Sequence, residues 1–125
     1  MSPLAGLGFL TAAAVGAPAR YLLDTWVTSR TRGPFPWGIL VVNVSGCFLL
    51  GLLTGLALDD GPSATTQTIL GSGGLGAFTT FSTFSVETVH LAEDGRIDRA
   101  LANVAATLFL GFAAAAAGIA LTGTF

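Results

Sequence analysis

One stretch of the chain combines the residue types that could bind a small ion. Residues 71–85 read GSGGLGAFTTFSTFS, so four glycines are followed by phenylalanines that alternate with hydroxyl side chains. The edge of an aromatic ring carries partial positive charge, and hydroxyl groups can donate hydrogen bonds. The pattern therefore favours contact with a small dehydrated anion and disfavours cations. Physical chemistry alone leaves the identity of that anion open.

Two further hydrogen-bond donors for such an ion, Asn43 and Thr107, lie in other apolar stretches of the chain. The candidate groups are the rings of Phe81 and Phe84 and the donors Asn43, Ser82, Thr83 and Thr107. Residues three apart share one face of a helix, which places the two rings together. An amide in hydrocarbon is costly unless it finds partners. Asn43 therefore has two interpretations, a hydrogen-bonded link between helices or a donor that lines a pore.

The elements that must position these groups are membrane-spanning helices. Of the 125 residues, 52% are hydrophobic and only 10% are charged, whereas soluble domains carry about 25% charged residues. A spanning helix needs ~20 mainly apolar residues. Four uncharged runs meet that length, at residues 1–19, 33–58, 61–86 and 100–125. We therefore expect an all-α membrane protein with four transmembrane helices in a single domain, residues 1–125.

The third of these helices is expected to be broken. The predicted helices run roughly from Leu4 to Trp26, Trp37 to Leu58, Thr65 to Leu91 and Arg99 to Leu121. Each glycine weakens a helix by about 1 kcal/mol relative to alanine, so the glycines should interrupt the third helix near Gly73–Thr80. Broken backbone at membrane depth is tolerated only where protein buries it or where it lines a wet cavity. The break is therefore a candidate ion site.

Other patterns in the sequence are weak. Residues 71–76 match G-x-G-x-x-G, but no strand precedes them, so we do not infer a nucleotide site. Glu87 and His90 have metal-site spacing without further ligands, and we interpret them as interfacial residues. No constellation typical of an enzyme emerges, and a net charge of −2 gives no reason to expect nucleic-acid binding.

Arg20 lies near the end of the first predicted helix. Tyr21 and Trp26 are neighbours of a type that favours the membrane interface. Arg20 and Asp24 are four residues apart and share a helical face. Two interpretations stay open: an arginine paired with Asp24, or an arginine that faces an aqueous vestibule and attracts anions.

Three segments, taken in order, resemble the fluoride-specific channel family known as Fluc or CrcB. They are residues 16–21 (GAPARY), 42–51 (VNVSGCFLLG) and 73–87 (GGLGAFTTFSTFSVE). The match spans the first three predicted helices, whereas the fourth is similar only in hydropathy and in Asn103 and Thr107. The resemblance implies passive fluoride export across the plasma (inner) membrane of a microbe by a multi-pass protein, which relieves fluoride toxicity. It also implies an antiparallel, dual-topology homodimer with two pores and a central structural Na⁺.

The resemblance assigns roles to residues by position. The backbone carbonyls of Gly76 and Thr79 would hold the Na⁺. The fluoride pore would comprise Asn43, Phe81, Phe84, Ser82, Thr83 and Thr107. Arg20 and Glu87 would lie in a vestibule. Some relatives have a tyrosine and a serine where this chain has Asn103 and Gly111, so the fourth helix departs from the family pattern.

The distribution of arginines suggests a second kind of partner. With four spans, the loops at residues 28–36 and 92–98 lie on one side, and all five arginines lie on or near that side. The positive-inside rule would place that side in the cytoplasm in every copy. The second hypothesis is therefore a heterodimer with an oppositely oriented paralogue, and the homodimer is the first because the functional stretch looks complete.

Two other functions compete with the channel. A small proton-coupled multidrug exporter of four helices would need a membrane-embedded carboxylate in its first helix, where the first one is Asp24 at the end. A non-transporting membrane assembly subunit would need neither the broken helix nor the alternation of phenylalanines with hydroxyls.

Overall fold

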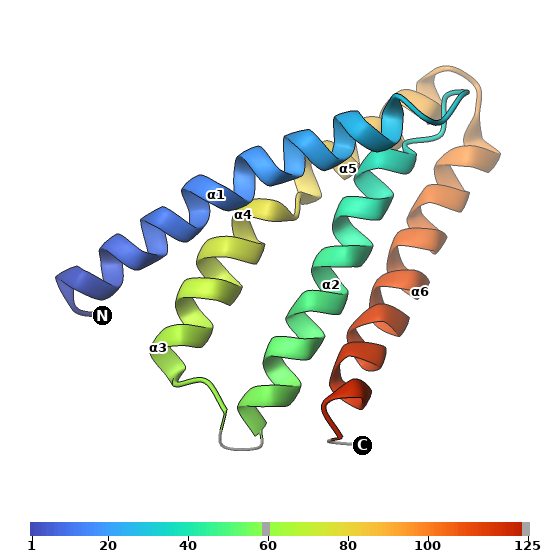
Figure 1. Ribbon diagram of the computed structural model, residues 1–125. Coiled ribbons are helices and arrows are strands. Elements are labelled where there is room, and N and C mark those ends of the chain that lie inside the picture. The colour runs from blue at the N-terminus through green and yellow to red at the C-terminus, as the bar shows by residue number, and fades with distance from the viewer. Residues whose placement is uncertain (59–60, 124–125) are drawn as a thin grey trace.

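The computed structural model describes residues 1–58 and 61–123, and it is built from helices (Figure 1). Within these residues, three helices are long and apolar enough to cross a membrane: α1 (Pro3–Thr28), α2 (Trp37–Leu58) and α6 (Ile97–Leu121). The predicted all-α fold is confirmed, and α2 has the predicted bounds. α6 begins two residues before the predicted Arg99, because the turn after α5 ends at Gly95 with a positive φ of 76°.

The segment between α2 and α6 contains several shorter helices. In chain order they are α3 (Ala64–Gln67), the π-helix η1 (Thr68–Leu75), α4 (Gly76–Phe78) and α5 (Phe81–Glu93). The first three follow one another without a gap. Thr79 and Thr80 are extended, with a ψ of 160° at Thr79 and a φ of −148° at Thr80. The helical path is therefore interrupted between α4 and α5.

The glycines are not the point of interruption, contrary to the reasoning from helix propensity. Residues 71–76 are helical, and the extended residues lie further along, at the end of the predicted range. A Cβ on Gly73 would lie 3.0 Å from the Phe9 carbonyl oxygen of α1, and a Cβ on Gly16 would meet the Gly74 carbonyl oxygen. Small residues let helices approach closely in membranes. The glycines therefore serve the contact between α1 and η1, and that contact outweighs their poor propensity.

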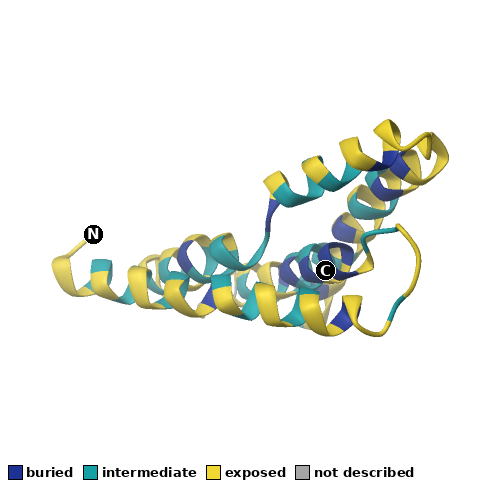
Figure 2. Ribbon diagram, turned by 90° about the horizontal axis from the view of Figure 1, so that it is seen from above, coloured by how far each residue is buried: buried dark blue, intermediate teal, exposed yellow. Residues whose placement is uncertain are grey.

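A second close contact joins α2 to α6, which lie side by side along most of their length (Figure 1). Gly51 of α2 faces the Ala115 carbonyl, and Gly118 of α6 faces the Phe48 carbonyl, each too closely for a side chain. The buried apolar residues are few and include Val42, which is fully buried on α2. Many residues along the long helices are exposed (Figure 2), and they include large apolar side chains such as Leu4, Trp26 and Phe109. A surface this apolar fits lipid or another protein chain.

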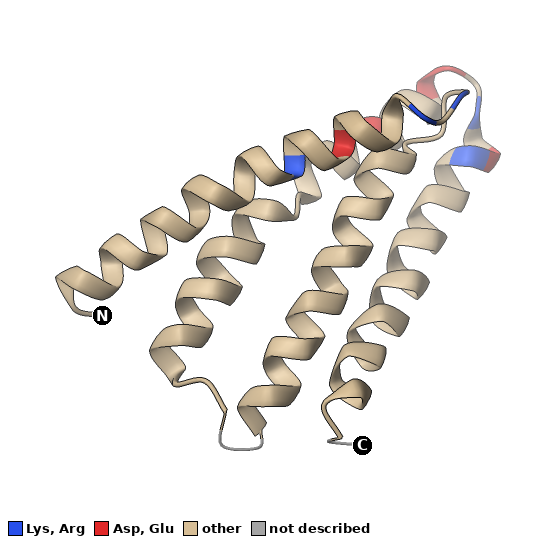
Figure 3. Cartoon of the chain, viewed as in Figure 1, with Lys and Arg blue, Asp and Glu red and all other residues tan. Residues whose placement is uncertain are grey.

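Charged residues gather at one end of the described part of the chain (Figure 3). The connection from α1 to α2 and the connection from α5 to α6 both lie at that end, as predicted. All five arginines lie toward it, together with the acidic residues of α1, α5 and the α5–α6 turn. Asp59 and Asp60 lie outside the described residues.

Candidate functional site

The interruption between α4 and α5 is held by one side chain of α2. Nδ2 of Asn43 donates to the Thr80 carbonyl oxygen at 2.9 Å, and the Thr80 N–H donates to Oδ1 of Asn43 at 2.9 Å. In a continuing helix that N–H would bond the carbonyl four residues earlier, at Gly76. Asn43 therefore satisfies backbone groups that the interruption leaves open, and the Gly76 carbonyl loses its usual donor.

Gly46 allows α2 to come this close to the interruption. It is buried one turn after Asn43 on the same face, and a Cβ there would meet Cγ2 of Thr79. The Phe78 ring lies 3.5 Å from the same Cβ position. Asn43 and Gly46 are three residues apart and share one face of α2. Together they allow the extended residues Thr79 and Thr80 to lie against that helix.

Thr80 also starts α5, as its N-cap. Its hydroxyl oxygen accepts from the Thr83 N–H at 3.1 Å and donates to the Thr83 hydroxyl at 3.2 Å. The Ser82 hydroxyl lies 3.3 Å from the same oxygen. A threonine N-cap stabilises a helix by about 1 kcal/mol relative to alanine. Ser82 and Thr83 thus belong to a capping cluster around the buried Thr80.

Arg20 of α1 reaches the interruption from the other side. Its guanidinium donates to the Thr79 carbonyl oxygen at 3.4 Å. Among the described residues, no ion pair joins Arg20 to Asp24, whose carboxylate instead accepts from the Thr28 hydroxyl at 3.2 Å. The interpretation of Arg20 as the partner of Asp24 is therefore wrong. Arg20 places a positive charge next to the extended backbone.

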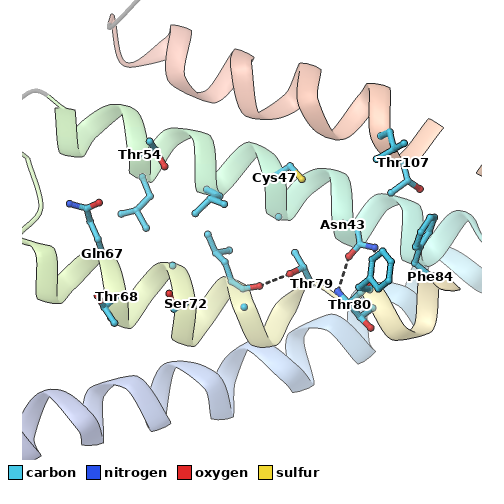
Figure 4. A pocket seen from close by; sticks show the side chains of 18 of the residues that line it. Asn43, Cys47, Thr54, Gln67, Thr68, Ser72, Thr79, Thr80, Phe84 and Thr107 are labelled. Atoms are coloured by element: carbon cyan, nitrogen blue, oxygen red, sulfur yellow. Dashed lines mark hydrogen bonds between the residues drawn. The ribbon is translucent and has the colours of Figure 1, made fainter. Parts of the chain in front are cut away.

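A cavity of about 800 Å³ opens between α2 and the α3–η1–α4 segment and ends at the interruption (Figure 4). We call it the central cavity. Four of the six predicted pore residues line it, and both residues predicted to bind Na⁺ do so as well. These six residues are Asn43, Phe81, Phe84, Thr107, Gly76 and Thr79. Ser82, Thr83, Arg20 and Glu87 are not among the residues that line it.

The two predicted rings lie together at the end of the cavity. The ring centroids of Phe81 and Phe84 are 5.6 Å apart, and the ring planes are inclined by 51°. Phe84 is half-buried, whereas Phe81 is 80% exposed on this single chain. Within the described part of this single chain, most of the Phe81 ring therefore has no protein neighbour.

Thr107 of α6 faces the same end of the cavity (Figure 4). Its Oγ1 is buried and has no hydrogen-bond partner within the part of the chain that the structure describes. A buried hydroxyl without a partner costs free energy, so this group is available to a ligand. One turn further on α6, Gly111 lies against Cys47, whose Sγ would be 3.4 Å from a Cβ there.

Sequence reasoning missed the polar residues along the length of the cavity. They are Cys47, Thr54, Gln67, Thr68 and Ser72, which line it together with leucines (Figure 4). Helical spacing could have found those of α2, because Cys47 and Thr54 follow Asn43 at four and eleven residues and so share its face. The residues of α3 and η1 could not be found in this way, because π-helical turns shift the register.

Glu87 lines a separate cavity of about 380 Å³ at the charged end. Asp24, His90 and Asp94 line it too, with residues of the α1–α2 connection. Glu87 therefore lies on the same side as the arginines, but Arg20 is not among the residues that line this smaller cavity. At the central cavity, the groups are neutral donors, backbone carbonyls and rings, which can bind and pass an ion without bond-breaking chemistry.

Comparison with known proteins gives a consistent result. A family profile described as "CrcB-like protein, Camphor Resistance (CrcB)" matches residues 7–119. A protein of Rubrobacter xylanophilus is 50% identical over 109 residues, covering 87% of this chain and 86% of its own length. One of Streptomyces avermitilis is 46% identical over 110 residues (88% and 89%), and one of Leifsonia xyli subsp. xyli is 42% identical over 123 residues (98% and 90%). All three are named "Fluoride-specific ion channel FluC 1".

Proposed function

This chain belongs to the CrcB family, and on that premise we propose that it is a fluoride-selective channel that exports fluoride passively and relieves its toxicity. The chain is a membrane protein, and we assign it no enzymatic activity. The observation that carries the proposal is the meeting of two phenylalanine rings, the Asn43 amide and the Thr107 hydroxyl at one end of the central cavity.

These groups can supply what a dehydrated fluoride ion needs. The Thr107 hydroxyl has no partner in the described part of the chain and can donate to the ion. The Asn43 amide has two N–H donors, and the Thr80 carbonyl takes one of them. The second N–H is left for an anion in the cavity. The ring edges of Phe81 and Phe84 add positive potential without a fixed charge that would trap the ion.

The exposure of Phe81 supports a second copy as part of the site. A single chain leaves that ring 80% exposed and leaves the central cavity open. We therefore propose an antiparallel, dual-topology dimer in which each chain spans the membrane four times, the third time through the interrupted α3–α5 segment. Each dimer would contain two pores. The homodimer is the first hypothesis, and the gathering of all arginines at one end supports the alternative of an oppositely oriented paralogue.

A structural Na⁺ fits the backbone at the interruption. The Gly76 carbonyl loses its helical donor because the Thr80 N–H bonds Asn43. The Thr79 carbonyl accepts from Arg20, but a carbonyl oxygen has two lone pairs, so one remains. Oxygen ligands suit a hard cation. Gly76 and Thr79 of each copy would hold the ion at the dimer centre, where its charge would oppose repulsion between carbonyl oxygens.

The expected location is the plasma (inner) membrane, with the arginine-rich end in the cytoplasm when the chain follows the positive-inside rule. No observation favours the exporter, since the acidic residue of α1, Asp24, lies at the charged end in the smaller cavity. A non-transporting assembly subunit would leave the Thr107 hydroxyl, which lacks a partner among the described residues, in the cavity without a use.

A growth experiment tests this function in cells. Bacteria without their own fluoride exporter should grow in fluoride when they express this chain, and they should tolerate less fluoride when they express the Phe84→Ile variant at equal level. Rescue of growth against a lipophilic drug, but not against fluoride, would instead support the exporter. No rescue of either kind, with the protein present in the membrane, would contradict the channel or require a paralogue.

A further inference from the structure

Asn103 is the most deeply buried polar side chain of the described residues, with 1% of its surface exposed. It lies on α6, and its Nδ2 donates to Oγ1 of Thr88 on α5 at 2.9 Å. Within α5 and α6, which the structure describes completely, this is the one side-chain hydrogen bond that joins the two helices. A buried amide is costly without such a partner, so the bond fixes the position of α5 along the axis of α6.

The bond continues from Thr88 to a residue of the central cavity. The Thr88 hydroxyl donates to the Phe84 carbonyl oxygen at 2.7 Å. A hydroxyl has one hydrogen and two acceptor lone pairs, so it can accept from Asn103 while it donates to Phe84. The result is a directed chain of hydrogen bonds from Asn103 through Thr88 to Phe84, which we call the Asn103 relay.

α5 needs such a support, because the interruption separates it from α4. At its beginning it is held through Thr80 and Asn43, and beyond that it packs mainly on α6. The relay holds α5 at Thr88, about two turns after Phe81, the first residue of α5. Without it, α5 could slide or rotate along α6 and take the Phe84 ring with it.

The relay ends at the Phe84 backbone, and Phe84 lines the central cavity together with Thr107. Thr107 is one turn after Asn103 and shares its face of α6. Both residues are at the end of the central cavity that lies at the interruption (Figure 4). Asn103 itself does not line that cavity, so it is not placed to touch an ion there.

We infer that Asn103 is a positioning residue that acts through Thr88 to hold the Phe84 ring beside the Thr107 hydroxyl, and that it thereby sets the rate of fluoride passage. This inference rests on the proposed channel function. It gives Asn103 a role different from that of an ion ligand, at a place where the fourth helix departs from the family pattern.

Four variants of the full chain, reconstituted into liposomes, test the relay. Asn103→Leu and Thr88→Val remove one group each at nearly constant shape, and Thr88→Ser keeps the hydroxyl. Thr11→Val is the matched control, because the Thr11 hydroxyl also donates to the carbonyl four residues earlier, but on α1 and away from α5. We expect fluoride efflux to fall about tenfold in Asn103→Leu and in Thr88→Val, and no further in the double variant. Thr88→Ser and Thr11→Val should keep normal efflux.

A label at position 84 tests the position of the ring independently of fluoride efflux. 4-Fluorophenylalanine at position 84 should give a ¹⁹F resonance that shifts or broadens in Asn103→Leu and Thr88→Val and stays unchanged in Thr11→Val. An unchanged resonance in both relay variants would overturn the inference, whatever the efflux. So would normal efflux in both, or losses that multiply in the double variant. If Asn103→Leu does not fold, the comparison of Thr88→Val with Thr88→Ser decides. A natural chain that moves no fluoride would contradict the proposed function, and the resonance would still decide whether the relay holds the ring.

Discussion

The side-chain amide of Asn43 and the backbone of Thr80 exchange two hydrogen bonds of 2.9 Å, one in each direction. The amide thus pairs with Thr80 as a neighbouring peptide would, and it does so from a different helix. This pairing satisfies backbone groups at the interruption between α4 and α5, which would be costly to leave without partners in an apolar environment. It also holds the Asn43 side chain at the wall of the central cavity.

Asn43→Asp should abolish fluoride efflux. The aspartate cannot donate to the Thr80 carbonyl, and its negative charge would repel an anion in the cavity. We expect a loss on the order of 100-fold, which corresponds to the cost of a charge at membrane depth. Electrode measurements of efflux from liposomes check this. Ser45→Ala is the control, because among the described residues the Ser45 hydroxyl bonds only the Val42 carbonyl of its own helix. Normal efflux in Asn43→Asp would remove Asn43 from the ion path.

Phe81→Ile and Phe84→Ile should each reduce efflux about tenfold or more, because an aliphatic side chain keeps the bulk and loses the positive ring edge. Both variants should remain folded, as size-exclusion chromatography in detergent can show. Phe109→Ile and Phe112→Ile on α6 are the matched controls, since those rings are 75% and 74% exposed and do not line the central cavity. The mechanism based on ring edges is wrong if both cavity variants conduct normally.

The helices could be predicted from the sequence because apolar runs and a lack of charge dominate in a membrane protein. Two details could not. The place of the interruption depends on Asn43 and Gly46 of another helix, whereas local propensity points to the glycines. The capping role of Ser82 and Thr83 depends on the extended conformation of Thr80, which their types alone do not reveal.

The candidate site was predictable where residue type implies a chemical role. Asn43, Phe81, Phe84 and Thr107 do meet at one cavity. Arg20 is different, because its sequence position fits both a pairing with Asp24 and an aqueous vestibule. The structure instead pairs it with the Thr79 carbonyl. The hydrogen-bond partner of a long side chain depends on which groups the fold brings near it, and the local sequence does not show this.

Gly16→Ala should destabilise the chain, because the new methyl group would meet the Gly74 carbonyl oxygen of η1, and backbone cannot move aside cheaply. We expect a loss of about 1–3 kcal/mol in the free energy of unfolding. Thermal or denaturant unfolding in detergent measures it. Gly6→Ala on the same helix is the control, since a Cβ there meets nothing within 4 Å. Equal stability of the two variants would contradict the close contact between α1 and η1.

Removal of Na⁺ should weaken the dimer and slow fluoride efflux. Without the ion, carbonyl oxygens of Gly76 and Thr79 from two copies would face one another uncompensated. The measurement is efflux and dimer dissociation in buffers where a large organic cation replaces all Na⁺, with ionic strength held constant. If neither quantity changes, the assignment of Na⁺ to Gly76 and Thr79 is wrong.

Fluoride efflux from liposomes that contain this chain alone tests the central claim most directly. A fluoride electrode follows the efflux, and a chloride electrode follows the same preparation. Fast loss of fluoride with chloride retained is the predicted result, and it would also show that no second kind of chain is needed. Well-folded protein that releases no fluoride, either alone or with a co-expressed paralogue, would contradict the proposal that this chain is a fluoride channel.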